Sequence, residues 1–171
     1  ARYKALEFCG PVIDAMSIEG RMTIANMAIE AGGKCGLFPV DDRTREYCRA
    51  HGRRGNKELS ADEGAVYDRE LSFDVSDMKP QVACPHLPDN VKPVGEVSDI
   101  SINQVVIGSC TNGRISDLRE AANFLKRRKV DSRVRTIVLP ATPAIWKQAL
   151  SEGLIEIFMD AGCIVGPPTC G

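Results

Sequence analysis

Val105-Val-Ile-Gly-Ser-Cys-Thr-Asn-Gly-Arg114 is the stretch that decides the fold of the second half of this 171-residue chain. Its first three residues are β-branched and apolar, which is typical of a buried strand, and the glycines and small polar residues that follow indicate a tight turn. An amphipathic pattern begins at Ile115 and continues to about Lys129. The sequence therefore predicts that a strand gives way to a helix just after Cys110.

Strand and helix patterns alternate along the rest of this half. Thr142-Pro143 is a typical helix start, because threonine caps the first turn and proline loses no needed hydrogen bond there. Gly153 interrupts the helical pattern. We expect strands at Val134–Leu139 and Cys163–Val165, and helices from Pro143 to Leu150 and from Ile155 to Ala161. This alternation favours a layered α/β fold with mainly parallel strands.

The first half shows the same kinds of pattern, followed by a proline-rich stretch. Pro80 to Asp99 contains four prolines and no sustained periodicity, which is typical of a connector. The chain should therefore fold as two subdomains, residues 1–97 and residues 98–171. In the first of these we expect three strands and two helices: strands at Tyr3–Phe8, Cys35–Val40 and Leu71–Val75, and helices at Ser17–Ala31 and from Asp41 or Asp42 to Arg49.

Composition fits a soluble globular protein. Hydrophobic residues make up 43% of the chain and charged residues 26%, so the chain can bury a core. Its 22 basic and 23 acidic side chains nearly cancel, which argues against a nucleic-acid or anionic-membrane partner. No apolar run approaches the roughly 20 residues that cross a bilayer, and the first ten residues lack a signal-peptide pattern. We expect a cytoplasmic protein.

The cysteines are numerous for this length, but their number, seven, is odd and their spacing is irregular. A disulfide framework is therefore not expected. Cys110 stands out because it lies between a strand and a helix, where ligands bind in open α/β sheets and where a helix N-terminus lowers the pKa of a thiol. These residues alone leave open whether Cys110 binds a metal, attacks a substrate or lies in a polar turn.

Two further features are ambiguous on their residues alone. Gly166-Pro-Pro-Thr-Cys-Gly171 is a stiff loop that presents Cys170, which suits a metal ligand and equally a proline-rich tail. Asn26 and Glu30 lie four residues apart on the first predicted helix, so an amide and a carboxylate share one face. Without further information, a solvated face is the more common meaning of such a pair.

Taken together, three segments resemble the aconitase superfamily in their order and separation, and most closely its isopropylmalate dehydratase type. They are Ser17–Ala31, Val106–Arg114 and Gly166–Gly171, and the likeness covers essentially the whole chain. The resemblance implies an α/β fold like the iron–sulfur domain of aconitase and a [4Fe-4S] cluster held by three cysteines. Cys110 and Cys170 match two of these three metal ligands.

The third cysteine of the motif would lie two positions beyond Gly171. Because a cluster with two of its three protein ligands binds weakly, we expect this chain alone to hold no cluster and to be inactive. The remaining cysteines match no ligand position of the family and are expected to be structural: Cys9, Cys35, Cys48, Cys84 and Cys163.

The resemblance also implies an activity. It is that of a hydro-lyase that interconverts 2-isopropylmalate and 3-isopropylmalate by dehydration and rehydration in leucine biosynthesis. By motif match, Asn26 and Glu30 are catalytic, and Asn112 and Arg114 bind the substrate. An arginine at position 114 favours the isopropylmalate type over true aconitases. The expected partners are the small subunit of the same dehydratase and a hydroxy di- or tricarboxylic acid, with no nucleic acid and no membrane.

Three alternatives remain open from the sequence. The parent enzyme could be a homoaconitase, or an aconitase- or methylmalate-type hydro-lyase of the same superfamily. From another class, the protein could be a cysteine-based redox protein with Cys110 as its reactive thiol, although no resolving cysteine is evident in the sequence. It could also be a non-catalytic scaffold whose cysteines are all structural.

Overall fold

The computed structural model describes residues 1–53 and 57–170. These residues form two compact units, one made of residues 1–37 together with 102–171, and the other of residues 38–101. The division into residues 1–97 and 98–171 stays a prediction from the sequence. Each unit is described here by itself.

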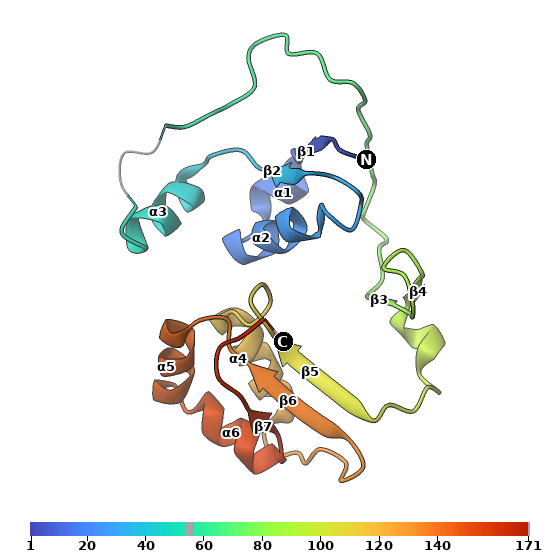
Figure 1. Cartoon of the computed structure of the whole chain (residues 1–171), viewed down its shortest axis with the longest axis vertical. Helices are drawn as coiled ribbons and strands as arrows, with labels where there is room; N and C mark the ends of the chain where they lie inside the picture. The colour runs from blue at the N-terminus through green and yellow to red at the C-terminus, as the bar shows by residue number, and fades with distance from the viewer. Residues whose placement is uncertain (54–56, 171) are drawn as a thin grey trace. The chain divides into compact units, whose positions relative to one another are not determined.

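A three-stranded parallel sheet organises the second half of the chain. It contains β5 (Gln104–Gly108), β6 (Arg135–Leu139) and β7 (Ile164–Val165), with β6 in the centre (Figure 1). In register, Val106 lies opposite Ile137, which in turn lies opposite Ile164. The predicted α/β fold with mainly parallel strands is confirmed.

Three helices pack beside this sheet: α4 (Ile115–Leu125), α5 (Pro143–Ser151) and α6 (Leu154–Ala161). The predicted start of α5 is confirmed, because Ile145 N–H donates to Thr142 Oγ1 at 3.2 Å. Gly153, with a φ of 74°, separates α5 from α6 as expected. The helix predicted to reach Lys129 ends at Leu125, because Lys126 leaves the helical conformation with a ψ of 124° and Arg127 follows with a positive φ of 61°.

The core of this region lies between the sheet and the helices. Leu118 from α4, Val138 from β6 and Phe158 from α6 are fully buried, and burial of side chains of this size stabilises a fold by about 1.5–3 kcal/mol each. The loops at the carboxyl ends of β5 and β6 therefore follow strands of a well-packed sheet. The remaining buried members of this core are Ala122, Ala149, Leu154, Ile155, Ala161 and Cys163.

The first 37 residues contain β1 (Ala5–Glu7), α1 (Pro11–Ala15), α2 (Ile18–Met27) and β2 (Cys35–Leu37). The two strands pair in parallel, and Ser17 caps α2 by accepting from Gly20 N–H at 3.2 Å. The helix ends at Met27, so the predicted helix to Ala31 is four residues too long. The chain turns there because β2 must return beside β1, where Lys34 N–H donates to the Lys4 carbonyl at 2.8 Å.

The second unit has little regular structure. It contains α3 (Asp42–Ala50), an antiparallel hairpin of β3 (Gln81–Ala83) and β4 (Val91–Pro93), and the 3₁₀-helix η1 (Val94–Val97). The region predicted as a featureless connector therefore holds a hairpin. The predicted strand Leu71–Val75 is wrong: residues 57–80 form an exposed segment without helix or strand (Figure 1), since no strand in the described residues pairs with it.

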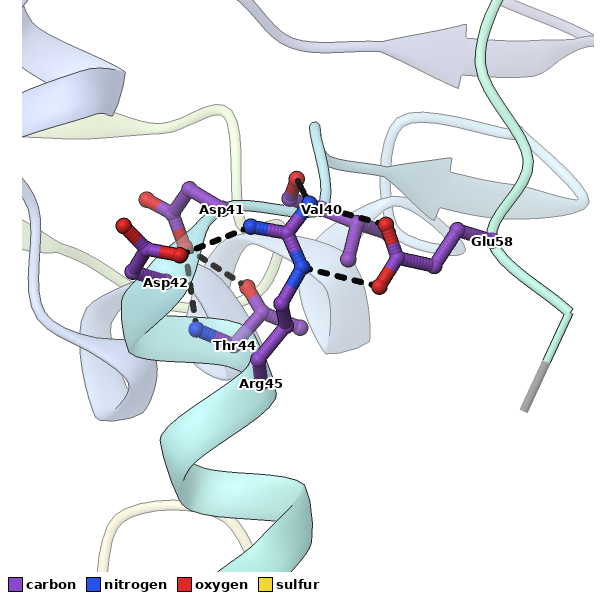
Figure 2. A network of polar contacts seen from close by, with 6 residues as sticks. All are labelled: Val40, Asp41, Asp42, Thr44, Arg45 and Glu58. Atoms are coloured by element: carbon purple, nitrogen blue, oxygen red, sulfur yellow. Dashed lines mark hydrogen bonds and ion pairs between the residues drawn. The ribbon is translucent and has the colours of Figure 1, made fainter. Parts of the chain in front are cut away.

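Arg45 ties the start of this exposed segment to α3 (Figure 2). Its Nε and Nη2 each donate to one carboxylate oxygen of Glu58 at 2.8 Å, and its Nη1 donates to Asp42 Oδ1 at 2.8 Å. This bidentate pair lowers the pKa of Glu58. Beside it, Asp41 caps α3 by accepting from Thr44 N–H at 2.9 Å, which decides between the two helix starts, Asp41 and Asp42, that the sequence left open. The network has a local structural role.

None of the helices in residues 1–53 and 57–170 combines the length and hydrophobicity needed to cross a membrane.

Candidate functional site

The loop after β5, residues 108–114 and hereafter the Cys110 loop, is held against the end of β6. Ser109 N–H donates to the Leu139 carbonyl, Gly113 N–H donates to the Ser109 carbonyl, and Ala141 N–H donates to the Gly113 carbonyl, all at 2.9 Å. A Cβ at position 113 would lie 2.4 Å from the Leu139 oxygen, so only glycine fits there. Backbone contacts therefore fix the conformation of the loop independently of its side chains.

Ser109 carries backbone strain next to the candidate ligand. Its φ is 102°, as is that of Gly108, and L-residues rarely adopt this region. Strain of this kind costs on the order of 1–3 kcal/mol and persists where the surrounding structure requires it. Here the turn at residues 108 and 109 redirects the chain out of the sheet and leaves Cys110 exposed.

The structure brings Cys110 and Cys170 together, although 60 residues separate them. Their Sγ atoms lie 3.6 Å apart and both residues are exposed. The loop that carries Cys170, residues 166–170 and hereafter the Cys170 loop, is also attached to β6. Gly166 N–H donates to the Val138 carbonyl at 2.9 Å. Gly171, the last residue of that motif, lies outside the described residues. The role of the two thiols as metal ligands stays a prediction.

The two thiols affect each other's ionisation. Hydrogen bonds from the Thr111 hydroxyl and the Cys170 thiol lower the pKa of Cys110, and the neighbouring Cys110 raises the pKa of Cys170. The pair thus favours one thiolate, on Cys110, and one shared proton. The direction agrees with the sequence-based expectation; the largest cause is the hydrogen bond with the Thr111 hydroxyl, and backbone hydrogen bonds at Cys110 and Thr111 lower the pKa further.

The described residues supply two thiols and no complete ligand set. Among them, no group of three or more His, Cys, Asp or Glu side chains could hold a metal ion. Thiolates are the ligands that iron–sulfur clusters require, so the chemistry of the Cys110 and Cys170 pair fits part of such a site.

Asn112 makes a contact that the sequence did not predict. Its Nδ2 donates to Thr23 Oγ1 at 3.1 Å, and the Thr23 hydroxyl donates to the Glu19 carbonyl one turn earlier on α2, at 3.0 Å. Asn112 is exposed and Thr23 is half-buried. Thr23 lies three residues before Asn26, and this helical spacing is the one signal in the sequence that could have marked it.

Arg114 is half-buried at the end of the Cys110 loop. Its Nε donates to the Thr111 carbonyl at 3.3 Å, and its backbone N–H donates to Asp117 Oδ2 at 3.0 Å. Burial raises the pKa of Asp117, with a further contribution from the charge of Glu19. The loop therefore holds the guanidinium through one of its five N–H groups, and the substrate-binding role of Arg114 stays a prediction.

Asn26 and Glu30 are both exposed. The prediction that they lie on one helix is wrong. Asn26 lies in the last turn of α2, whereas Glu30 lies three residues beyond its end. Within the described residues, Asn112 of the Cys110 loop donates to Thr23 of α2, and no hydrogen bond joins Asn26 or Glu30 to this loop. Their catalytic role also stays a prediction.

The remaining cysteines differ in burial. Cys163 is buried in the core and desolvation raises its pKa, as expected of a structural cysteine. Cys48 and Cys84 are half-buried, while Cys9 and Cys35 are exposed. A structural role through burial therefore applies to Cys163 and not to Cys9 or Cys35.

Comparison with known proteins gives a consistent result. The sequence model of the Aconitase family (aconitate hydratase) matches residues 2–99 and 91–171. Over all 171 residues the chain is 75% identical to the 3-isopropylmalate dehydratase large subunit of Oleidesulfovibrio alaskensis, 69% identical to that of Nitratidesulfovibrio vulgaris and 54% identical to that of Halothermothrix orenii. It spans 41% of the length of each of these relatives. With its two family matches reaching from residue 2 to residue 171, the chain belongs to the aconitase family.

Proposed function

We propose that this chain is part of a [4Fe-4S] hydro-lyase that interconverts 2-isopropylmalate and 3-isopropylmalate by dehydration and rehydration in leucine biosynthesis. The observation that carries the proposal is the approach of Cys110 and Cys170 to 3.6 Å from two separate loops. The names of the relatives, all large subunits of 3-isopropylmalate dehydratase, supply the reaction.

The cysteine pair fits a cluster in its donor chemistry. Enzymes of the aconitase family generally contain iron–sulfur clusters, and Cys110 and Cys170 are exposed thiols of which one is favoured as thiolate. They would hold two irons, with a third cysteine supplied by the full-length polypeptide. When bound, the cluster supplies a Lewis-acidic iron that makes a substrate hydroxyl a better leaving group.

The side chains around the thiols supply complementary chemistry. The guanidinium of Arg114 suits a substrate carboxylate, because its N–H groups can pair with two oxygens at once. Asn112 and Asn26 offer amide hydrogen bonds to a hydroxy acid. Glu30 would hold or release a proton at its carboxylate as the substrate loses or regains water.

The proposal applies to the full-length protein and its partner. Because the chain spans 41% of its relatives, further substrate-binding groups would come from the rest of the polypeptide and from a small subunit, the counterpart implied by the name large subunit. The proposed substrate is a hydroxy dicarboxylic acid.

Anaerobic reconstitution of the full-length protein with its small subunit tests the proposal. We expect iron, absorption by thiolate-to-iron charge transfer, and interconversion of the two isopropylmalates; Cys110→Ser and Cys170→Ser should each lose iron and activity. Cys9→Ser is the matched control, since Cys9 is also exposed but belongs to neither loop. Full iron content and activity in Cys110→Ser would contradict the assignment. Citrate, homocitrate and methylmalate as substrates test the related hydro-lyases.

A cysteine-based redox protein is the second candidate, and one observation favours it. The sequence showed no resolving cysteine for Cys110, but Cys170 lies within 3.6 Å of it. Under this alternative the functional state is a Cys110–Cys170 disulfide, formed when an external two-electron oxidant such as a peroxide or a disulfide takes up the two electrons and the two thiol protons, and the wild-type protein has no dehydratase activity after reconstitution. Dehydratase activity that depends on both cysteines and on iron would reject it.

A further inference from the structure

We propose that Thr23 is a positioning residue that fixes the orientation of the Asn112 amide and thereby makes Asn112 an acceptor for a substrate hydroxyl. The inference rests on the proposed function, in which Asn112 binds substrate. It concerns a residue that neither the motifs nor the names of the relatives single out.

The argument begins with the single proton of the Thr23 hydroxyl. A backbone carbonyl can only accept, so the hydroxyl must donate its proton in the 3.0 Å contact with the Glu19 carbonyl. Its lone pairs then face Asn112, where it can only accept. The 3.1 Å contact must therefore come from the amide nitrogen Nδ2 of Asn112 and not from Oδ1.

The orientation of the amide has a chemical consequence. One of the two Nδ2 protons of Asn112 is directed at Thr23, which fixes the plane of the amide and turns Oδ1 away from Thr23. Oδ1 is therefore placed as an acceptor for a ligand, while the second Nδ2 proton stays available as a donor. An amide oxygen accepts from an O–H group and is repelled by a carboxylate. Asn112 therefore recognises the hydroxyl of a hydroxy acid, and the unsaturated acid formed by loss of water offers it no such partner.

The contact is suited to orientation more than to folding. Asn112 is exposed, and an exposed hydrogen bond exchanges with water at little net gain in stability. Valine has the shape of threonine and a similar helix propensity, so Thr23→Val removes the acceptor without disturbing α2. Thr23→Ser keeps the hydroxyl.

The test uses the reconstituted full-length protein with its small subunit. For Thr23→Val we expect KM for the hydroxy acid to rise about tenfold, the effect of losing roughly one hydrogen bond, with kcat little changed. KM for the unsaturated acid, which has no hydroxyl, should not change. Thr23→Ser should restore the wild-type KM, and Thr23→Val combined with Asn112→Ala should be no worse than Asn112→Ala alone. Ser151→Ala is the matched control, because that hydroxyl also donates to a carbonyl of the preceding turn, that of Gln148 at 2.9 Å.

Three results would overturn the inference: an unchanged KM in Thr23→Val, an equal rise for both substrates, or a Thr23→Ser variant as impaired as Thr23→Val. An inactive wild-type protein would instead overturn the proposed function. In that case the role of Thr23 is tested by the NMR resonance of the Asn112 side-chain amide. This resonance is assigned by its loss in the Asn112→Ala variant. It should shift in Thr23→Val and remain in place in Thr23→Ser, and an unchanged resonance in Thr23→Val rejects the role of Thr23.

Discussion

Replacement of Gly113 by alanine should unfold the Cys110 loop. The added Cβ would lie 2.4 Å from the Leu139 oxygen, 2.5 Å from the Ser109 oxygen and 2.7 Å from the Ala141 nitrogen. All three are backbone atoms: the Leu139 oxygen and the Ala141 nitrogen bond the loop to the end of β6 and the residues after it, and the Ser109 oxygen accepts the bond from Gly113 N–H inside the loop. Movement away from the methyl group therefore breaks those bonds. At about 1 kcal/mol each, three lost bonds reduce the free energy of unfolding by roughly 3 kcal/mol.

Urea denaturation of the full-length protein measures this loss, and iron content after reconstitution measures its effect on Cys110. Both should fall in Gly113→Ala. Gly95→Ala is the control, because no atom lies within 4 Å of a Cβ built at position 95. If Gly113→Ala matched Gly95→Ala in both its denaturation midpoint and its iron content, the backbone contacts would not be what holds the loop.

Three further predictions concern the scaffold. Leu118→Ala should destabilise the protein by about 2–5 kcal/mol in the same denaturation assay, because the side chain is fully buried between the sheet and the helices; a loss below 1 kcal/mol would contradict the packing. Thr142→Ala should cost about 1 kcal/mol through loss of the cap of α5, with Thr142→Ser expected near wild type. Because the ion pair with Arg45 lowers the folded-state pKa of Glu58, its stabilising effect is present above the unfolded value of about 4.3 and disappears as the pH falls through the folded value. Denaturation midpoints of the wild type and Glu58→Gln should therefore converge in acid, and a difference that persists at pH 2 would contradict this linkage.

Local signals in the sequence predicted local structure well. The cap of α5 at Thr142 and the break at Gly153 depend on contacts within a few residues, and both are confirmed. For α3 the sequence left Asp41 and Asp42 open, and the structure places the cap at Asp41. The predicted end of α2 was wrong because the turn after Met27 is set by pairing of β2 with β1, which helical periodicity does not report.

Strand predictions failed where a partner strand decides the outcome. Leu71–Val75 alternates as a strand does, yet it pairs with no strand within the described residues, and all of it except the half-buried Val75 is exposed. The hairpin of β3 and β4 was missed because prolines in the stretch suggested a connector. Pro93 is tolerated there because it lies at the last position of β4 in a hairpin of only two strands.

The candidate site was predictable in its cysteines but not in their surroundings. Cys110 and Cys170 lie in motifs with specific spacing, and the structure places them side by side. Thr23 lies within the segment Ser17–Ala31, but nothing in that segment indicates its contact with Asn112, which joins residues 89 positions apart. A single sequence offers no pattern that reports a pairing of this range.

Both cysteine loops are attached to consecutive residues of one strand, through the carbonyls of Val138 and Leu139. The two loops that carry the thiols are therefore anchored to one buried strand, and not to two separate elements that could move independently. A displacement of β6 therefore moves the attachment points of both loops together, because Ser109 and Gly166 bond to neighbouring carbonyls of the same strand.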